Sequence, residues 1–229
     1  CMMVPLHVAG YNPGPGSKES SLLRHVLNAE LGKRKIPSRA ALESFYESHR
    51  IAGDPGANLG QYISLALLLS SPPDFKLTIK EEDLPPDAAR VADFVPLLRK
   101  FYSEVRLGSR RSQLQAHYEK EISRYSAQIR EAITKINGYL RIPGAAYLGR
   151  TYSVILELLS SPNLIQARIY GANYFLVAAP LDEIKMEEIE HQYLHFVLDP
   201  LAAKHVQIIN KKRVLGEFVQ KASRLSSEY

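Results

Sequence analysis

The stretch from Ser109 to Leu140 constrains the fold of this chain most. Its apolar residues recur at three- and four-residue steps with charged residues mostly between them, which places the apolar side chains on one face of a helix. These residues are Leu114, Tyr118, Ile122, Tyr125, Ile129, Ile133 and Ile136. We therefore expect one long structural helix that covers a sheet or a neighbouring helix.

The sequence before this helix predicts a lead-in, two helices and a pair of strands. Residues 1–16 end in a run of Pro and Gly, which predicts an extended lead-in, and 17–58 has helical spacing. Tyr62–Leu69 is short and apolar, which favours a buried strand with Phe75–Lys80 as its partner. Helical spacing then returns, and Pro96 predicts a kink or break within it.

After the long helix the pattern changes to strands and then back to helix. Residues 147–159 and 167–178 predict two strands in a hairpin, and a helix follows up to Pro200. Residues 206–229 predict a C-terminal helix. The expected fold is α+β, with a small antiparallel or mixed sheet packed against long helices. We expect a single domain over 17–229, which includes the strands and long helices of 59–140.

Composition bounds the class of protein. The chain has 229 residues, of which 45% are hydrophobic, enough for a sizeable core. Lys and Arg number 29 against 24 Asp and Glu, but the positive residues are dispersed, so we expect no nucleic-acid partner. No apolar run approaches the roughly 20 residues that cross a bilayer, so we expect no transmembrane segment.

Two histidines four residues apart, His191 and His195, lie in the helix predicted before Pro200. Side chains four apart project from one face of a helix, the spacing that a zinc ion requires of two imidazoles. In zinc peptidases with the HExxH motif, a glutamate after the first histidine takes a proton from the metal-bound water. Here that residue is Gln192, whose amide has no carboxylate to accept a proton at neutral pH.

A helical wheel divides this helix into two sides. The apolar side holds Met186, Ile189, Tyr193, Phe196 and Val197. The other side holds Ile184, Glu187, Glu188, His191, His195 and Leu198, bordered by Gln192 and Asp199. A metal-binding helix at the floor of a cleft has this pattern, and so has an ordinary amphipathic helix with a solvated face.

Two strands followed directly by an HxxxH helix is the order found in zincin-type metallopeptidases, where the strand nearest the cleft aligns a peptide by strand addition. The segment 191–201, HQYLHFVLDPL, resembles the HExxH helix of uncharacterised bacterial zincin-like families, and the resemblance covers residues 147–201. It implies a zinc cofactor, His191 and His195 as its ligands, and Gln192 in the place of the general base.

A catalytic zinc needs a third protein ligand, which in gluzincin-type enzymes is a glutamate on the next helix. Glu217 is the only carboxylate of the predicted C-terminal helix before its penultimate residue, so the resemblance implies Glu217. Asp199 is expected to point along its helix, and His205 lacks the glycine of a metzincin turn. Glu157 and Glu188 are alternative bases, although structural roles suit both better.

Two functions from different classes follow. The first is a degenerate, gluzincin-like metallopeptidase domain, impaired as an enzyme, which binds a peptide or protein in the cleft above the HxxxH helix. The second is a non-metal interaction or scaffold domain whose histidines belong to a solvated polar face. The chain begins at Cys1, which is typical of a lipid-modified mature N-terminus and also of a piece cut from a longer chain. With the zincin resemblance, this favours an exported protein.

Overall fold

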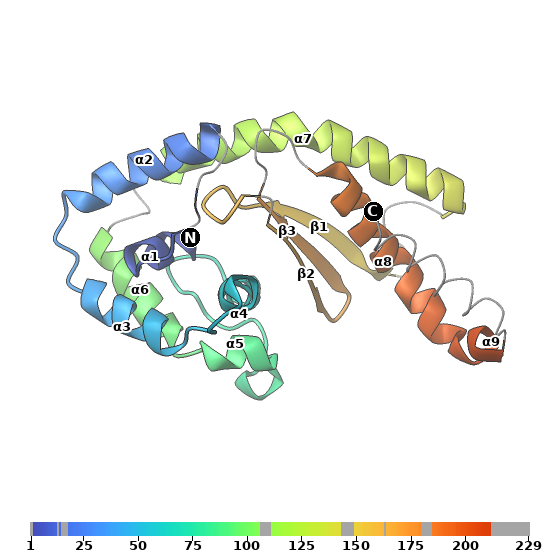
Figure 1. The fold of residues 1–229 in the computed structure, drawn as a ribbon, viewed down its shortest axis with the longest axis horizontal. Coiled ribbons are helices and arrows are strands. Elements are labelled where there is room, and N and C mark those ends of the chain that lie inside the picture. The colour runs from blue at the N-terminus through green and yellow to red at the C-terminus, as the bar shows by residue number, and fades with distance from the viewer. Residues whose placement is uncertain are drawn as a thin grey trace. The chain divides into compact units, whose positions relative to one another are not determined.

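The computed structural model describes residues 2–12, 14, 18–105, 111–142, 149–162, 164–179 and 185–211. The elements in chain order are α1 (Met3–Val8), α2 (Lys18–Gly32), α3 (Arg39–Ser48), α4 (Pro55–Leu67), the 3-10 turn η1 (Glu81–Asp83), α5 (Pro86–Arg90), α6 (Phe94–Val105), α7 (Arg111–Leu140), β1 (Thr151–Leu156), β2 (Ile165–Tyr170), β3 (Asn173–Ala178), α8 (Met186–Lys204) and α9 (Val206–Lys211) (Figure 1). This mixture of helices and a small sheet confirms the predicted α+β class.

Contacts divide the chain into two units. The N-terminal unit comprises Cys1–Ala127, Val154–Arg168 and Phe175–Lys185, and the C-terminal unit comprises Gln128–Ser153, Ile169–Tyr174 and Met186–Tyr229. The boundary therefore passes through α7 and through each of the three strands. The single domain expected over 17–229 stays a prediction.

The three strands form a mixed sheet in the order β1-β3-β2. The amides of Thr151 and Glu157 donate to the carbonyls of Ala172 and Ala178, each at 2.9 Å, so β1 runs parallel to β3. A short turn joins β2 to β3, and Gly171 adopts a φ of 58° there, a conformation that side chains disfavour. The single strand predicted for 167–178, paired with 147–159 in a hairpin, is therefore wrong, because this turn divides it in two.

The first helix corrects the expected extended lead-in. Met3–Val8 is an α-helix, and Met3, Leu6 and Val8 are buried in the N-terminal unit. The residues that break helices begin only at Gly10, whose φ is 101°. The apolar residues before Gly10 can therefore form a buried helical turn. The Pro and Gly residues within 1–16 had predicted an extended segment instead.

The segment predicted as the buried strand Tyr62–Leu69 is mostly helix. It belongs to α4, which begins at Pro55 after the N-cap Asp54, whose carboxylate accepts from the Ala57 amide at 2.8 Å. The residues from Asn58 to Leu65 are buried on all sides, so the apolar run has no amphipathic period to identify it. Only an isolated bridge between Leu69 and Leu77 remains of the predicted strand pair.

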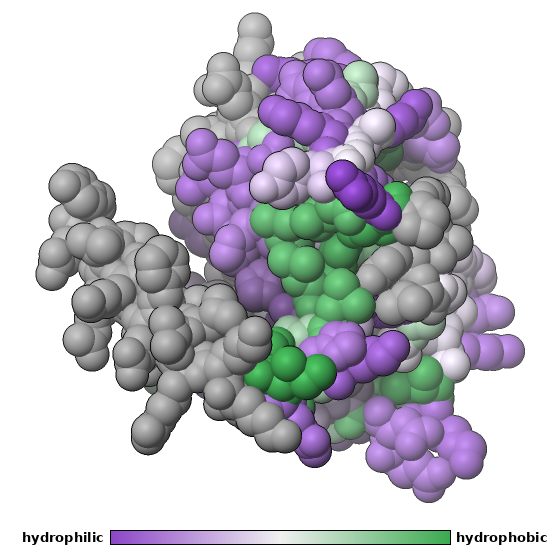
Figure 2. All heavy atoms as spheres, turned by 90° about the vertical axis from the view of Figure 1, so that its right-hand side faces the viewer, coloured by the Kyte–Doolittle hydropathy of each residue, from purple (hydrophilic) through white to green (hydrophobic). Residues whose placement is uncertain are grey.

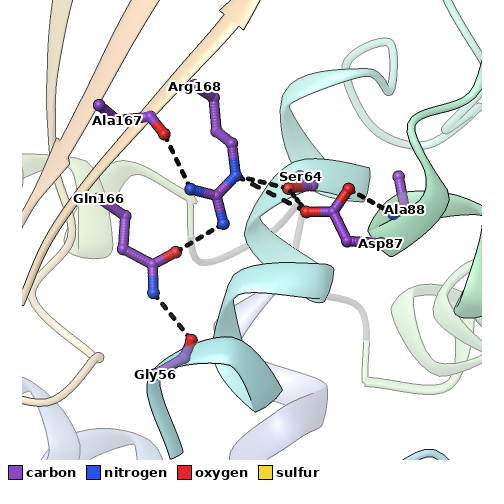
Figure 3. Close-up of polar contacts among 7 residues, drawn as sticks. All are labelled: Gly56, Ser64, Asp87, Ala88, Gln166, Ala167 and Arg168. Atoms are coloured by element: carbon purple, nitrogen blue, oxygen red, sulfur yellow. Dashed lines mark hydrogen bonds and ion pairs between the residues drawn. The ribbon is translucent and has the colours of Figure 1, made fainter. Parts of the chain in front are cut away.

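A polar network fixes α4 to its neighbours in the N-terminal unit (Figure 3). Ser64 is fully buried; its hydroxyl donates to Asp87 of α5 at 2.5 Å and accepts from Nε of Arg168 on β2 at 2.7 Å. The Arg168 guanidinium also donates to the side-chain oxygen of Gln166 at 3.0 Å, and Gln166 donates to the Gly56 carbonyl at 2.9 Å. These bonds satisfy buried polar atoms that would otherwise destabilise the fold.

The predictions for the long helices are confirmed. The pattern of Ser109 to Leu140 becomes α7, with 30 residues. A break occurs beside Pro96, because α5 ends at Arg90 and α6 begins at Phe94. Pro96 therefore lies in a first helical turn, where a missing N–H costs no helical hydrogen bond. In the part of the chain that the structure describes, no helix is long and apolar enough to cross a membrane.

Candidate functional site

The histidines lie on α8, whose two sides are those predicted from the sequence. Ile189, Tyr193, Phe196 and Val197 are buried on one side, whereas His191 and His195 are exposed on the other. Glu187 and Glu188 occupy the first turn, where negative charge favours a helix. The helix thus presents both imidazoles to solvent from a well-packed base.

Side chains of the C-terminal unit hold α8 at three points. The Tyr193 hydroxyl donates to Asn137 of α7 at 2.8 Å, and the Tyr152 hydroxyl of β1 donates to the Ile189 carbonyl at 3.3 Å. Rings of Tyr152 and Tyr193 meet edge to face with centroids 5.0 Å apart. These contacts fix the rotation of α8 about its axis and so fix the direction in which the histidines project.

The third contact that holds α8 compensates for a proline inside the helix. Pro200 has no N–H, so the carbonyl four residues earlier, that of Phe196, loses its helical partner. Arg150 supplies a replacement, because its Nη1 donates to this carbonyl at 2.7 Å while its guanidinium lies 4.8 Å from the centre of the Phe196 ring. The helix can therefore continue through Pro200 to Lys204.

The two imidazoles converge on one point. His191 Nε2 lies 3.1 Å from His195 Nε2, and the ring centroids are 4.8 Å apart. Two nitrogens bound to one tetrahedral zinc at about 2.05 Å lie about 3.3 Å apart. The observed spacing differs from that value by only a few tenths of an ångström, so the distance between the two nitrogens is compatible with a shared metal ion.

Asp199 orients the second histidine. Its two carboxylate oxygens lie 3.1 and 3.2 Å from His195 Nδ1. A carboxylate there favours the tautomer with the proton on Nδ1, which leaves the lone pair of Nε2 free for a metal. Asp199 thus points along α8, as expected from the sequence, and acts on the site through His195.

Gln192 is held by a tyrosine of the sheet. The Tyr174 hydroxyl on β3 donates to Gln192 Oε1 at 2.9 Å. Burial raises the pKa of Tyr174, and the negative charge of Asp199 adds to the rise while Arg150 opposes it, so the hydroxyl keeps its proton at neutral pH. Gln192 is therefore an amide whose side-chain oxygen is already engaged.

The third ligand is not found among the described residues. Glu217 lies outside them, and within them no three His, Cys, Asp or Glu side chains gather closely enough to hold a metal. Glu157, considered as a base, belongs to the N-terminal unit, where it accepts from Tyr118 at 2.9 Å. Glu188 and His205 are exposed on α8 and at its end.

Sequence reasoning did not assign the contacts of three residues that shape this site, namely Tyr174, Arg150 and Asp199 in its role as a partner of His195. The contact between Asp199 and His195 could have been predicted, since residues four apart on a helix lie on the same face. Pro200 carried a signal as well, since it stands four residues after Phe196 and so leaves that carbonyl in need of a donor. Nothing in the sequence pairs Tyr174 with Gln192, because that contact depends on the turn between β2 and β3.

Apolar side chains are exposed where α8 ends and α9 begins. Leu198 is 41% exposed, Ile208 59%, and Val206 and Ile209 47% each. Figure 2 views the molecule from the side of α8 and α9 and shows apolar side chains at the surface among polar ones.

The N-terminal unit contains a separate cavity of about 890 Å³. Tyr11, Tyr46 and Asn58 line it, and their polar groups bond to one another or to Ser161: Asn58 donates to Tyr46 at 2.9 Å, and Tyr11 bonds to the Ser161 hydroxyl at 2.9 Å. These bonds fix the side chains in the wall of the cavity, and α8 remains the stronger candidate site.

The chain matches no protein-family model, no curated protein and no solved structure.

Proposed function

We propose that the C-terminal unit binds a zinc ion through His191 and His195 and uses it to hold a peptide or protein. The observation that carries this proposal is the 3.1 Å separation of the two Nε2 atoms on an exposed helix face. Asp199 supports it, because a carboxylate on the far nitrogen of a histidine is the usual second partner of a zinc ligand. Glu217 remains our choice for the third ligand.

Zinc, when bound, supplies a Lewis acid that attracts carbonyl or carboxylate oxygens. The surrounding residues favour binding over hydrolysis. Gln192 has no basic oxygen to take a proton from water, and its amide oxygen already accepts from Tyr174. The proposed function is therefore that of a degenerate zincin-like binding domain, and the exposed apolar side chains of Val206, Ile208 and Ile209 offer further contact area.

A second function is favoured by the same pair of histidines in their metal-free form. Two neutral imidazoles can satisfy each other, with one Nε2–H donating to the other Nε2, which fits the 3.1 Å distance. In that case the histidines are a solvated polar pair, and the unit is a protein-interaction domain without a metal.

Thermal unfolding with added zinc distinguishes the two. A metal that binds only the folded state stabilises it, and at 100 times Kd the gain is about 2.7 kcal/mol, so we expect Tm to rise by about 5 °C or more. His195→Ala should abolish the rise, whereas His25→Ala, at an exposed histidine of α2, should keep it. An equal rise in all three proteins would indicate adventitious binding and contradict the zinc proposal.

Restoring the base tests the loss of catalysis. A zinc-loaded Gln192→Glu variant should gain measurable hydrolysis of an unstructured peptide if only the base is missing. No activity in this variant, with zinc bound, would show that the site lacks more than a base and would leave the binding role in place.

A further inference from the structure

The cavity of about 890 Å³ lies within the N-terminal unit, and its wall combines buried and exposed polar groups. The described residues that line it come mainly from the end of α1, the end of α3, the loop that follows and the start of α4 (Figure 1). Tyr46 and Asn58 are buried, whereas Glu47, Arg50 and Asp54 are exposed. The volume falls within the range of about 300–1,000 Å³ that is usual for small-molecule sites.

The hydroxyl of Tyr46 has a proton to donate. Asn58 Nδ2 donates to the hydroxyl oxygen at 2.9 Å, and the Asn58 amide is fixed in that orientation because its Oδ1 accepts from the Ile51 amide at 3.2 Å. Burial raises the pKa of Tyr46, so the proton stays on the oxygen at neutral pH. No described residue accepts this proton. A ligand oxygen in the cavity would therefore satisfy a donor on a buried side chain.

Tyr11 and Ser161 leave a second hydroxyl proton at the cavity. The Tyr11 oxygen accepts from the Ser161 amide at 2.9 Å, and the two hydroxyls bond to each other at 2.9 Å. A bond between two hydroxyls uses one of their two protons, whichever residue donates. The other proton has no acceptor in the part of the chain that the structure describes. The wall thus holds two spare donors, both on neutral side chains.

The exposed part of the wall supplies acceptors. Arg50 donates to Glu47 at 3.2 Å, and the Asp54 carboxylate accepts from the Ala57 amide at 2.8 Å as the N-cap of α4. Each carboxylate oxygen has two lone pairs, so both carboxylates can accept further hydrogen bonds. The cavity therefore offers donors on its buried side and acceptors where it meets solvent.

This combination favours a neutral ligand with several hydroxyls. An ammonium group has donors only, so it would leave both spare protons without an acceptor. A carboxylate or phosphate has acceptors only, and it would be repelled by Glu47 and Asp54. A hydroxyl both accepts and donates, so one ligand hydroxyl can bond to Tyr46 while another bonds to a carboxylate.

We infer that this cavity binds a neutral sugar, whose hydroxyls accept from Tyr46 and from the Tyr11–Ser161 pair and donate to Glu47 or Asp54. The site is separate from the histidines of α8 and needs no metal. The inference therefore goes beyond the proposed function, and either can fail without the other.

A ligand-observed NMR titration of the full chain, without added metal, tests the class of ligand. The probes are the methyl pyranosides of glucose, galactose and mannose, which differ in the arrangement of their hydroxyls. Each is paired with its 6-carboxylate and its 2-amino derivative, which keep the ring but carry a charge. We expect at least one neutral glycoside to bind with a Kd below about 10 mM and more tightly than both of its charged derivatives.

Two results of this titration would overturn the inference. In the first, none of the three neutral glycosides binds with a Kd below about 10 mM. In the second, a charged derivative binds at least as tightly as its neutral parent, which would assign the cavity to an anion or a cation instead.

Two variants assign the binding to the cavity. Tyr46→Phe removes one spare donor and keeps the ring, so it should weaken sugar binding by about tenfold. Ala52→Trp adds a large side chain at an exposed position of the wall and should abolish binding, and it decides the question if Tyr46→Phe does not fold. The matched controls Tyr139→Phe and Ala127→Trp, at exposed positions of α7, should bind as the wild type does. Unchanged binding in Ala52→Trp, or in folded Tyr46→Phe, would mean that the sugar binds elsewhere and that the inference is wrong.

Discussion

His7 shows how a single buried residue makes the stability of the N-terminal unit depend on pH. Its Nε2 lies 2.7 Å from the Leu159 carbonyl, so the proton sits on Nε2 and the ring donates. Burial lowers the pKa of His7; the bond to Leu159 opposes this, Arg24 adds to the lowering and Glu157 opposes it. The folded state therefore prefers neutral His7.

This shift predicts a loss of stability in mild acid. The unfolded chain has a histidine pKa of about 6.5 and so binds the proton more readily than the folded state below that pH. Tm should fall between pH 7.5 and 5.5, and His7→Gln, which keeps an N–H donor, should show a smaller fall. His25→Gln, at an exposed histidine, should behave like wild type. An unchanged pH dependence in His7→Gln would show that other groups cause the fall.

At the scale of elements, α4 illustrates both the success and the failure of sequence reasoning. The helices with a clear amphipathic period, α7 and α8, were predicted because one exposed face leaves a readable pattern. The limits of α7 were nearly correct, whereas α8 continues past the predicted end at Pro200 to Lys204. The helix α4 is buried on all sides, and its apolar run around Tyr62 has the length of a strand. The cap at Asp54 and Pro55 was the signal that could have identified it.

Gly60 on α4 gives a test of the packing against β2. A Cβ at Gly60 would lie 2.7 Å from Nη2 of Arg168 and 3.1 Å from Oε1 of Gln166, and both side chains are held by hydrogen bonds. Gly60→Ala should therefore lower the free energy of unfolding by about 1–3 kcal/mol in urea titrations. Gly138→Ala on α7 meets nothing within 4 Å and should raise it by about 0.5–1 kcal/mol.

These opposite signs are the informative result, because both substitutions bring the same gain in helix propensity. If Gly60→Ala stabilised the protein as Gly138→Ala does, Arg168 and Gln166 would not be held against α4, and the network of Figure 3 would contribute little.

At the scale of the whole molecule, the sequence predicted the class and the long helices on either side of the strands, but neither the division of the second strand nor the division into two units. The units share α7 and every strand, so each is assembled from segments that are distant in the chain. No periodicity reports such an arrangement. The candidate site was more accessible to prediction: both histidines and Gln192 lie on one helix, whereas their partners Tyr174 and Arg150 come from the sheet region.

The central claim is that His191 and His195 hold a metal ion. Elemental analysis of the purified, untagged protein, with His191→Ala as the paired variant, tests it most directly. We expect close to one zinc per chain in the wild type and none in the variant, because one imidazole cannot retain the ion alone. Absence of zinc from the wild type after dialysis against micromolar zinc, or equal zinc in both proteins, would contradict it.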